Sequence, residues 1–250
     1  MRPKESASSV KPSAKKKGAA AKGDSPTAEE VIAELRTLAT TETRDGMSRF
    51  GIPSDNAFGV TMADMKQLAK RLGKNHVLAG ALWKSGWYEA RMLAALIDDP
   101  AKVTPAQMDR WCRDFDNWAI CDTVCFALFD RTPHAFRKIA QWCNERDEFG
   151  KRAAFALLAS VALHDKKAPD EPFVEGLMFV NEASSDGRNF VKKAVNWALR
   201  AIGGRNSSLH GAAMSLARTL AESPDPTARW IGRDALRELT KKKPRRNVSA

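Results

Sequence analysis

The chain has 250 residues, 43% of them hydrophobic, and a formal net charge of +11 at pH 7. This length is enough for one or two domains with a sizeable hydrophobic core. No apolar run approaches the roughly 20 residues that a membrane span needs, and residues 1–22 lack the apolar stretch of a secretory signal. We therefore expect no membrane partner. The four cysteines follow no metal-binding or disulfide-scaffold spacing, so we expect a reduced, cytoplasmic compartment.

Most of the positive charge lies at the two ends of the chain. Residues 1–24 carry seven basic side chains against two acidic ones, and residues 241–246 carry five basic side chains, which leaves a net charge of only +1 for the rest. We expect residues 1–25 to form a disordered basic tail, because a segment rich in Lys, Ser, Ala and Pro cannot bury enough apolar surface to offset ordering. Residues 26–240 are then the folded domain, and residues 241–250 are a basic C-terminal tail.

Helical signals begin at Thr27 and continue to the end of the domain. Thr27 and Glu30 match a capping box followed by apolar residues at helical spacing. Residues 47–60 are expected to form a loop, because Gly51 and Pro53 interrupt any regular pattern. Further helices are expected over residues 61–73, 75–86, 88–98, 104–112, 118–130, 132–143, 148–163, 170–180, 189–202, 207–221 and 227–239.

The pattern predicts an all-α protein, since no segment shows the β-branched alternation of a strand. About a dozen helices with short connections recur along the chain, and pairs of them give units of roughly 35–40 residues, the period of HEAT or armadillo arrays. We therefore predict a curved, HEAT-like helical-repeat solenoid whose concave face holds the functional site. A compact helical bundle is the alternative.

The helix expected over residues 118–130 carries the first functional candidate. Trp118 and Asp122 lie four residues apart and therefore share a helix face. Most of this helix is apolar, so the carboxylate must be satisfied by another group or be available to a positive charge. A structural role as an acid at a helix N-terminus is the alternative. Cys121 and Cys125 are interpreted as small core hydrophobes, and zinc is disfavoured because no histidine stands near them at ligand spacing.

Two later helices carry further candidates. Arg152 follows Lys151 at the start of an alanine-rich apolar segment, where an arginine is more often solvated or ion-paired than functional. Trp197 lies between Lys193 and Arg200 on one helix face. Taken alone, such a tryptophan is more often part of a core than of a functional site.

Three motifs gain meaning together: Phe115-Asp-Asn-Trp118-Ala-Ile-Cys-Asp122, Lys151-Arg152-Ala-Ala, and Phe190-Val-Lys-Lys-Ala-Val-Asn-Trp197-Ala-Leu-Arg200. In this order and at these separations they resemble the DNA alkylation repair family, the HEAT-like-repeat (AlkD-like) alkylpurine DNA glycosylases, over about residues 27–240. The resemblance implies a monofunctional hydrolase that cleaves the N-glycosidic bond of N3- or N7-alkylated purines in double-stranded DNA. It implies no metal or other cofactor, a monomer, and a nucleoid-associated location.

The resemblance also implies that Trp118 and Asp122 lie in the concave cleft, with Trp197 against the damaged nucleotide. A purine alkylated at N3 or N7 is already cationic, so it leaves without a protein general acid. The transition state instead needs stabilisation of an oxocarbenium-like sugar, which one carboxylate can supply electrostatically or by positioning water. Indole faces suit contact with a cationic group. We therefore predict Asp122 as the catalytic residue and the two tryptophans as a lesion cradle.

The basic candidates are assigned to the DNA backbone. By the same resemblance Arg152 contacts a phosphate near the lesion, where an arginine can bind bidentately and fix register. Lys193 and Arg200 are further candidates for backbone contacts. Asn117 and Ala119 depart from the family pattern, which often has an aromatic residue or an aspartate beside the tryptophan, and are expected to alter the cleft wall and the lesion range.

Two other functions remain open from the sequence. A non-catalytic helical-repeat protein that recognises distorted or branched DNA would bind in a salt-sensitive way without releasing a base. A protein-interaction scaffold, the commonest use of helical repeats, predicts a neutral apolar groove instead of a basic concave face.

Overall fold

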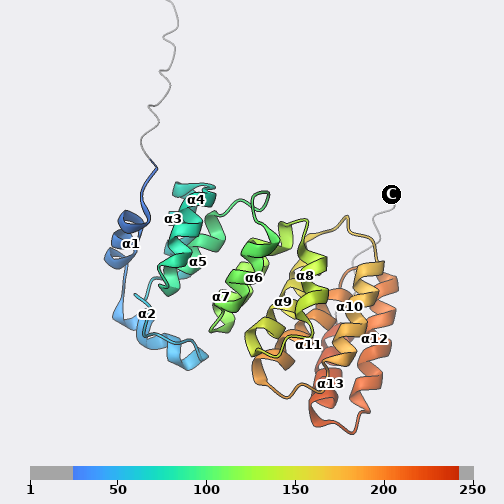
Figure 1. Cartoon of the computed structure of the whole chain (residues 1–250). Helices are drawn as coiled ribbons and strands as arrows, with labels where there is room; N and C mark the ends of the chain where they lie inside the picture. Colours follow the sequence, from blue (N-terminus) through green and yellow to red (C-terminus); the bar gives the residue numbers. More distant parts are fainter. Residues whose placement is uncertain (1–24, 242–250) are drawn as a thin grey trace, which may run out of the picture.

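The computed structural model describes residues 25–241, so nearly all of both expected basic tails, residues 1–25 and 241–250, lies outside the described residues. Within this range the chain forms thirteen α-helices and two short 3-10 helices, without any strand. Figure 1 shows the helices following one another as a single array, with α1 at one end and α12 and α13 at the other. The prediction of an all-α protein is confirmed.

The elements of the first half are α1 (Ala28–Thr37), α2 (Thr41–Gly46), the 3-10 helix η1 (Met47–Phe50), α3 (Met62–Leu72), α4 (His76–Lys84), α5 (Tyr88–Ile97) and α6 (Pro105–Arg113). Those of the second half are α7 (Trp118–Ala127), the 3-10 helix η2 (Phe129–Arg131), α8 (Ala135–Trp142), α9 (Glu148–His164), α10 (Glu171–Glu182), α11 (Asn189–Gly203), α12 (Ser207–Ala221) and α13 (Pro226–Lys241). Most bounds lie within one or two residues of the prediction.

Local capping explains why many helices begin where the sequence predicts. The Thr27 hydroxyl accepts the Glu30 backbone N–H while the Glu30 carboxylate accepts that of Thr27, which completes the predicted capping box. Thr61, Asn75 and Thr104 likewise accept a backbone N–H three residues further on and begin α3, α4 and α6. Cap and helix are adjacent in sequence, so these starts need no tertiary information.

Two segments differ from the prediction. The helix that was expected to run to residue 130 ends at Ala127, and η2 follows it. The Thr132 hydroxyl donates to the Phe129 carbonyl oxygen at 2.8 Å and so completes η2 instead of capping a new helix, which explains why α8 begins only at Ala135. The start of the segment expected as a loop forms η1, and α2 before it has no counterpart among the predicted helices.

The helices pack as two rows, an inner row and an outer row that includes α4, α8 and α12. One row, here called the inner row, contains α3, α5, α7, α9, α11 and α13, each packed against the next. Helices α4, α8 and α12 each pair with the helix that follows them in the chain and flank this row. The Cys121 and Cys125 thiols face the Phe149 and Ala153 carbonyl oxygens at 3.8 and 3.6 Å, so α7 and α9 run parallel and bring their N-terminal turns to the same end.

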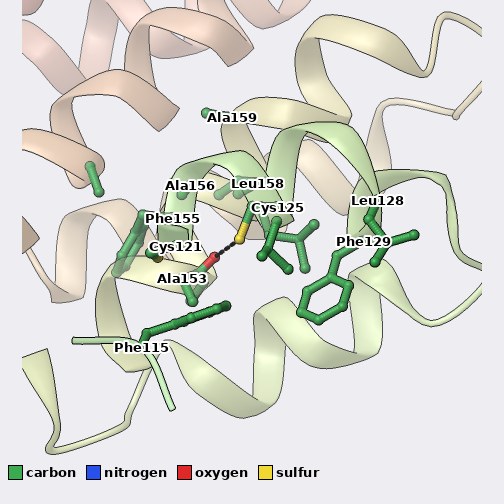
Figure 2. Close-up of a cluster of buried hydrophobic side chains, with 14 of the residues drawn as sticks. Phe115, Cys121, Cys125, Leu128, Phe129, Ala153, Phe155, Ala156, Leu158 and Ala159 are labelled. Carbon is green, nitrogen blue, oxygen red and sulfur yellow. Dashed lines mark hydrogen bonds between the residues drawn. The ribbon is translucent and has the colours of Figure 1, made fainter. Parts of the chain in front are cut away.

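A continuous hydrophobic core joins the two rows, with α9 at its centre (Figure 2). The alanine-rich run from residue 153 to residue 159 is completely buried, and its small side chains allow the neighbouring helices to approach closely. Gly232 in α13 meets the same need, because a Cβ there would lie 2.3 Å from the Ala221 nitrogen in α12. The four cysteines are free and buried, and burial raises the pKa of the Cys121 and Cys125 thiols.

No helix within residues 25–241 is both long enough and apolar enough to cross a membrane.

Candidate active site

An open cavity of about 550 Å³ lies where the N-terminal parts of α7, α9 and α11 meet the C-terminal end of η1. This volume is within the range of small-ligand pockets. Trp118, Asp122, Arg152 and Lys193, which are four of the predicted site residues, meet in its wall, whereas Trp197 and Arg200 do not. The complete lining is Arg49, Phe50, Gly51, Trp118, Asp122, Arg152, Asn189, Phe190 and Lys193.

The Asp122 carboxylate is held by a two-point ion pair. Arg152 donates from Nε to Oδ1 at 2.9 Å and from Nη2 to Oδ2 at 2.6 Å. Its Nη1 donates to the Phe190 carbonyl oxygen at 2.6 Å, so one guanidinium joins α7, α9 and α11. The Arg152 side chain is only 7% exposed, but the Asp122 side chain remains 20% exposed at the cavity wall.

Asp122 does not serve the start of its helix. The side chain of Asn117 accepts the Ile120 backbone N–H at 3.0 Å, so Asn117 is the N-cap and α7 begins at Trp118. Asp122 therefore lies in the second turn, beyond the positions where a cap or a first-turn acid acts. Trp118 and Asp122 line the same cavity one turn apart, as their spacing predicts.

The ion pair and its burial act in opposite directions on the carboxyl group. Burial raises the pKa of Asp122 above its ordinary value, although the Arg152 guanidinium works against this. Burial would lower the pKa of Arg152, but the Asp122 carboxylate outweighs burial and raises it. Two short charge-assisted hydrogen bonds favour the ionised pair at neutral pH. A carboxylate has about four acceptor positions, so about two remain for a group in the cavity.

A buried carboxylate in α5 anchors the end of the loop of residues 47–60, whose beginning, residues 49–51, forms one wall of the cavity. Glu89, which is fully buried, accepts the backbone N–H groups of Phe58, Gly59 and Val60 at 2.7–3.2 Å. Gly59 has a φ of +91°, and a Cβ there would lie 2.3 Å from the Thr40 carbonyl oxygen. Only glycine fits this position, and the loop is held in one place against α5.

Trp118 ties the tip of this loop, Phe50 and Gly51, to α7. Its Nε1 donates to the Phe50 carbonyl oxygen at 2.8 Å. Gly51, which ends η1 with a φ of +68°, lies against Phe190, whose ring would be 3.5 Å from a Cβ at that glycine. Below the tip, Ala119 of α7 packs with three buried apolar loop residues, Met47, Ile52 and Ala57. The tip is therefore a supported wall of the cavity.

Positive charge predominates in the cavity. Arg49, Arg152 and Lys193 stand against the single carboxylate of Asp122. Arg49 and Lys193 are exposed, and neither side chain forms a hydrogen bond or ion pair with any other residue in the range 25–241. The N-terminal ends of helices carry partial positive charge, which adds to the attraction for anions where α7 begins; at the start of α11 the Phe190 N–H already donates to the Glu148 carboxylate at 3.2 Å. The cavity is suited to an anionic ligand that also presents a cationic or apolar group to Asp122 and Trp118.

Trp197 lies outside this cavity, one turn further along α11 than Lys193. It is half-buried, and its ring stacks on that of Phe126 with centroids 6.5 Å apart. Phe126 also meets the His164 ring edge-on at 4.1 Å. We call Phe126, His164 and Trp197 the aromatic cluster. The two tryptophans that the sequence predicts as one cradle thus lie at different positions along the inner row.

Arg200 is also directed away from the cavity. Its Nη1 lies 3.7 Å from Oδ2 of Asp234 in α13, and Asn196 Nδ2 donates to the same oxygen at 2.6 Å. Arg200 therefore contributes to the contact between α11 and α13.

Some lining residues were not among the sequence candidates. Phe190 belongs to a motif quoted above, and its spacing to Lys193 and Trp197 places all three on one helix face, so periodicity could have found it. Arg49 and Phe50 gave no such signal, because Phe50 meets Trp118 across 68 positions of sequence. Within residues 25–241, no three His, Cys, Asp or Glu side chains are grouped as a metal site requires.

The sequence model of the family described as DNA alkylation repair enzyme matches residues 31–239. The chain belongs to this family. The matched range contains every residue of the cavity, so this DNA alkylation repair family member keeps the whole site within the family's common region.

A comparison with solved structures supports the architecture. A chain described as a member of "a new family of proteins related to the HEAT-like repeat DNA glycosylases with affinity for branched DNA structures" matches with a TM-score of 0.72 and 21% identity. The match covers 88% of this chain and 98% of that one. It confirms the predicted HEAT-like repeat fold. No curated protein matches the chain.

Proposed function

We propose that the protein is a monofunctional DNA glycosylase that hydrolyses the N-glycosidic bond of cationic N3- or N7-alkylated purines in duplex DNA. The observation that carries this proposal is the Asp122 carboxylate, oriented by Arg152 in the wall of an open, cationic cavity beside Trp118. Membership of the DNA alkylation repair family supports alkylated DNA as the substrate. The proposal includes action as a monomer on double-stranded DNA in the cytoplasm, at the nucleoid.

Hydrolysis of this bond requires one correctly positioned anion from the protein, because the alkylated base leaves without a general acid. The bond between C1′ and the purine nitrogen breaks, and its electron pair neutralises the alkylated base as it leaves. Water then adds to C1′ and releases a proton. Asp122 has about two acceptor positions free, so it can stabilise the positive charge that develops on the sugar or accept a hydrogen bond from the attacking water.

Arg152 acts in this proposal as a positioning residue. At least three of its five N–H groups are used by Asp122 and by the Phe190 carbonyl oxygen, and little of the side chain is exposed. This differs from the exposed phosphate clamp that the sequence predicts. We assign the principal phosphate contacts to Arg49 and Lys193, whose charges are unpaired within residues 25–241.

The aromatic side chains are assigned to two different parts of the bound DNA. Trp118 and Phe190 line the cavity and would contact the damaged nucleotide directly. Trp197, in the aromatic cluster, would contact the DNA backbone about one helical turn away. Arg200 is assigned at most an indirect role, through the packing of α11 against α13.

The test is the release of 7-methylguanine and 3-methyladenine from methylated duplex DNA under single-turnover conditions. Removing one electrostatic group that acts in the transition state typically lowers the rate by roughly 100- to 1000-fold, and we expect this loss for Asp122→Asn. Asp116→Asn is the matched control, because that carboxylate is 59% exposed and lies near the start of the same helix. Equal release by wild type and Asp122→Asn would reject the role of Asp122, and no release by wild type would reject the function.

Binding of branched or distorted DNA without base release is the second candidate. Both Asp122 oxygens accept from Arg152, which offsets the carboxylate charge, and the structural neighbour is described as having affinity for branched DNA. This candidate predicts salt-sensitive binding to junctions and no free base. A protein-interaction scaffold is less well supported, because three cations against one carboxylate do not make a neutral apolar groove.

A further inference from the structure

Phe50 presents an aromatic ring at the mouth of the cavity. It is 66% exposed, whereas its aromatic neighbours Trp118 and Phe190 are half-buried. Single exposed apolar residues are common on protein surfaces, so exposure by itself does not assign a role. The support beneath the ring, the charges around it and the cavity beside it distinguish Phe50 from an incidental exposed residue.

The backbone of Phe50 is held on both sides. Its carbonyl oxygen accepts the Trp118 indole N–H at 2.8 Å, and the Ile52 N–H returns to the Met47 carbonyl oxygen at 3.2 Å across the tip. Met47 and Ile52 are buried in the small core that contacts α7. The ring is therefore displayed from a rigid base, and a contact made through it would cost little ordering of the backbone.

The surroundings of the ring favour nucleic acid over protein as the ligand. Arg49 precedes Phe50 in the chain and Lys193 lies in the same cavity wall, and both cations are unpaired within residues 25–241. The other large apolar residues that are at least 40% exposed lie outside this cavity: Val77, Phe126, Val174, Met178 and Trp230. Among the described residues, an exposed aromatic face thus coincides with unpaired positive charge at this cavity.

We propose that Phe50 is a stacking platform for a nucleobase that lacks a neighbour, and that the protein prefers DNA in which base stacking is interrupted. The inference rests on the proposed binding of DNA at this cavity. A phenyl ring has no hydrogen-bonding atom with which to read the edges of base pairs in a groove. Its complementary partner is a base face, which an intact duplex covers and a junction or gap exposes.

The experiment compares binding to a three-way junction with binding to an intact duplex of matched length and sequence, by fluorescence anisotropy. Phe50→Ala and Phe50→Leu should weaken junction binding by roughly tenfold, in the range found when base-stacking aromatic residues are removed. Duplex binding should change by less than about twofold, because no base face is offered there. Phe50→Trp should retain the preference for the junction.

Two further readouts make the stacking specific. A 2-aminopurine at the branch point should lose fluorescence on binding wild type but much less on binding Phe50→Leu, which keeps an apolar side chain without a ring. Met178→Ala, at a 60% exposed position on α10, is the matched control and should change neither affinity. Thermal unfolding followed by circular dichroism checks that each variant folds.

The inference is overturned if Phe50→Ala leaves junction binding intact, if it weakens junction and duplex equally, or if Phe50→Leu behaves as wild type. Base release from methylated duplex, measured in parallel, separates this inference from the proposed glycosylase. A wild-type protein that binds junctions through Phe50 but releases no base would reject the enzyme and keep the platform. A wild-type protein that binds no DNA would overturn both.

Discussion

Two carboxylates near the middle of the array are paired with side chains of α9, yet their surroundings differ. Asp122 in α7 accepts two hydrogen bonds from Arg152, and Asp130 in η2 contacts His164 Nδ1. The Asp130 side chain has no exposed surface, whereas 20% of the Asp122 side chain is exposed beside the cavity. Pairing across helices is thus a general way for this array to hold an acid, and of these two acids Asp122 alone is exposed to the cavity and available to a ligand there.

A third carboxylate is also buried and paired with a histidine, as Asp130 is. Asp98, at the end of α5, is fully buried and its Oδ1 lies 2.6 Å from His76 Nδ1. Its other oxygen accepts Gln107 Nε2 at 2.7 Å. Asp98 and Asp130 thus sit inside packed interfaces with a histidine as partner, whereas Asp122 has an arginine that remains charged at all accessible pH values.

The largest expected effect concerns the loss of the arginine. Arg152→Leu should lower the free energy of unfolding by about 3–5 kcal/mol, because it leaves a buried carboxylate without its counter-charge. Urea denaturation followed by circular dichroism measures this change. The double variant Asp122→Asn/Arg152→Leu should recover part of the loss, since no unpaired charge remains. A double variant less stable than Arg152→Leu would show that the pair is not coupled in this way.

Acid pH should distinguish the two carboxylates next. Because the pKa of Asp122 is raised, its charge is lost as pH falls through a value above that of an ordinary aspartate. The kcat/KM for base release should therefore fall about tenfold per pH unit on the acid side of that pKa. Asp122→Asn should lose this acid limb and Asp130→Asn should keep it. An unchanged limb in Asp122→Asn would assign the titration to another group.

The two tryptophans offer a smaller contrast. Trp118→Ala should slow base release by roughly 5- to 30-fold, as expected for the loss of a desolvated contact between an indole face and a cation. Trp197→Ala should slow base release only about two- to threefold, because this ring stacks on Phe126 outside the cavity. The loss of an aromatic contact with a cation at a solvent-exposed site costs roughly 0.5 kcal/mol. Single-turnover rates at saturating protein measure both. Equal losses would restore the single cradle that the sequence predicts.

The smallest expected effect concerns DNA affinity. Lys193→Gln should weaken duplex binding a few-fold and reduce the slope of log affinity against log salt by about one unit, as expected for the loss of one phosphate contact. Arg200→Gln is the matched variant, and its slope should stay unchanged because Arg200 lies beside Asp234. Titrations at several salt concentrations give both slopes. A larger change for Arg200→Gln would move the DNA path toward α13.

The elements that sequence reasoning predicted well are those set by local chemistry. The capping residues Thr27, Thr61 and Asn75 act on N–H groups three residues away, so their helices begin where predicted. Trp118 and Asp122 share a face because both lie on one helix. The start of α8 was predicted wrongly at Thr132. A threonine hydroxyl can cap the helix that follows or donate to a carbonyl oxygen three residues before it, and Thr132 does the second, to Phe129.

The parts that could not be predicted depend on register between distant segments. Arg152 meets Asp122 across 30 positions, and the sequence alone does not say that its guanidinium points into the array instead of toward solvent. Phe50 reaches the site through the hydrogen bond from Trp118, 68 positions away, while buried Glu89 holds the later part of the same loop against α5. The separation of Trp197 from the cavity likewise depends on how α11 is placed along α9.

The central claim is that Asp122 stabilises positive charge on the sugar of a bound nucleotide. Its most direct test compares the affinities for a duplex with a cationic pyrrolidine abasic nucleotide and for one with a neutral tetrahydrofuran abasic nucleotide. We predict that wild type and Asp130→Asn bind the cationic duplex about 100-fold more tightly, as transition-state mimics allow, and that Asp122→Asn loses this preference. Equal affinity of wild type for the two duplexes, or a preference that survives in Asp122→Asn, would contradict it.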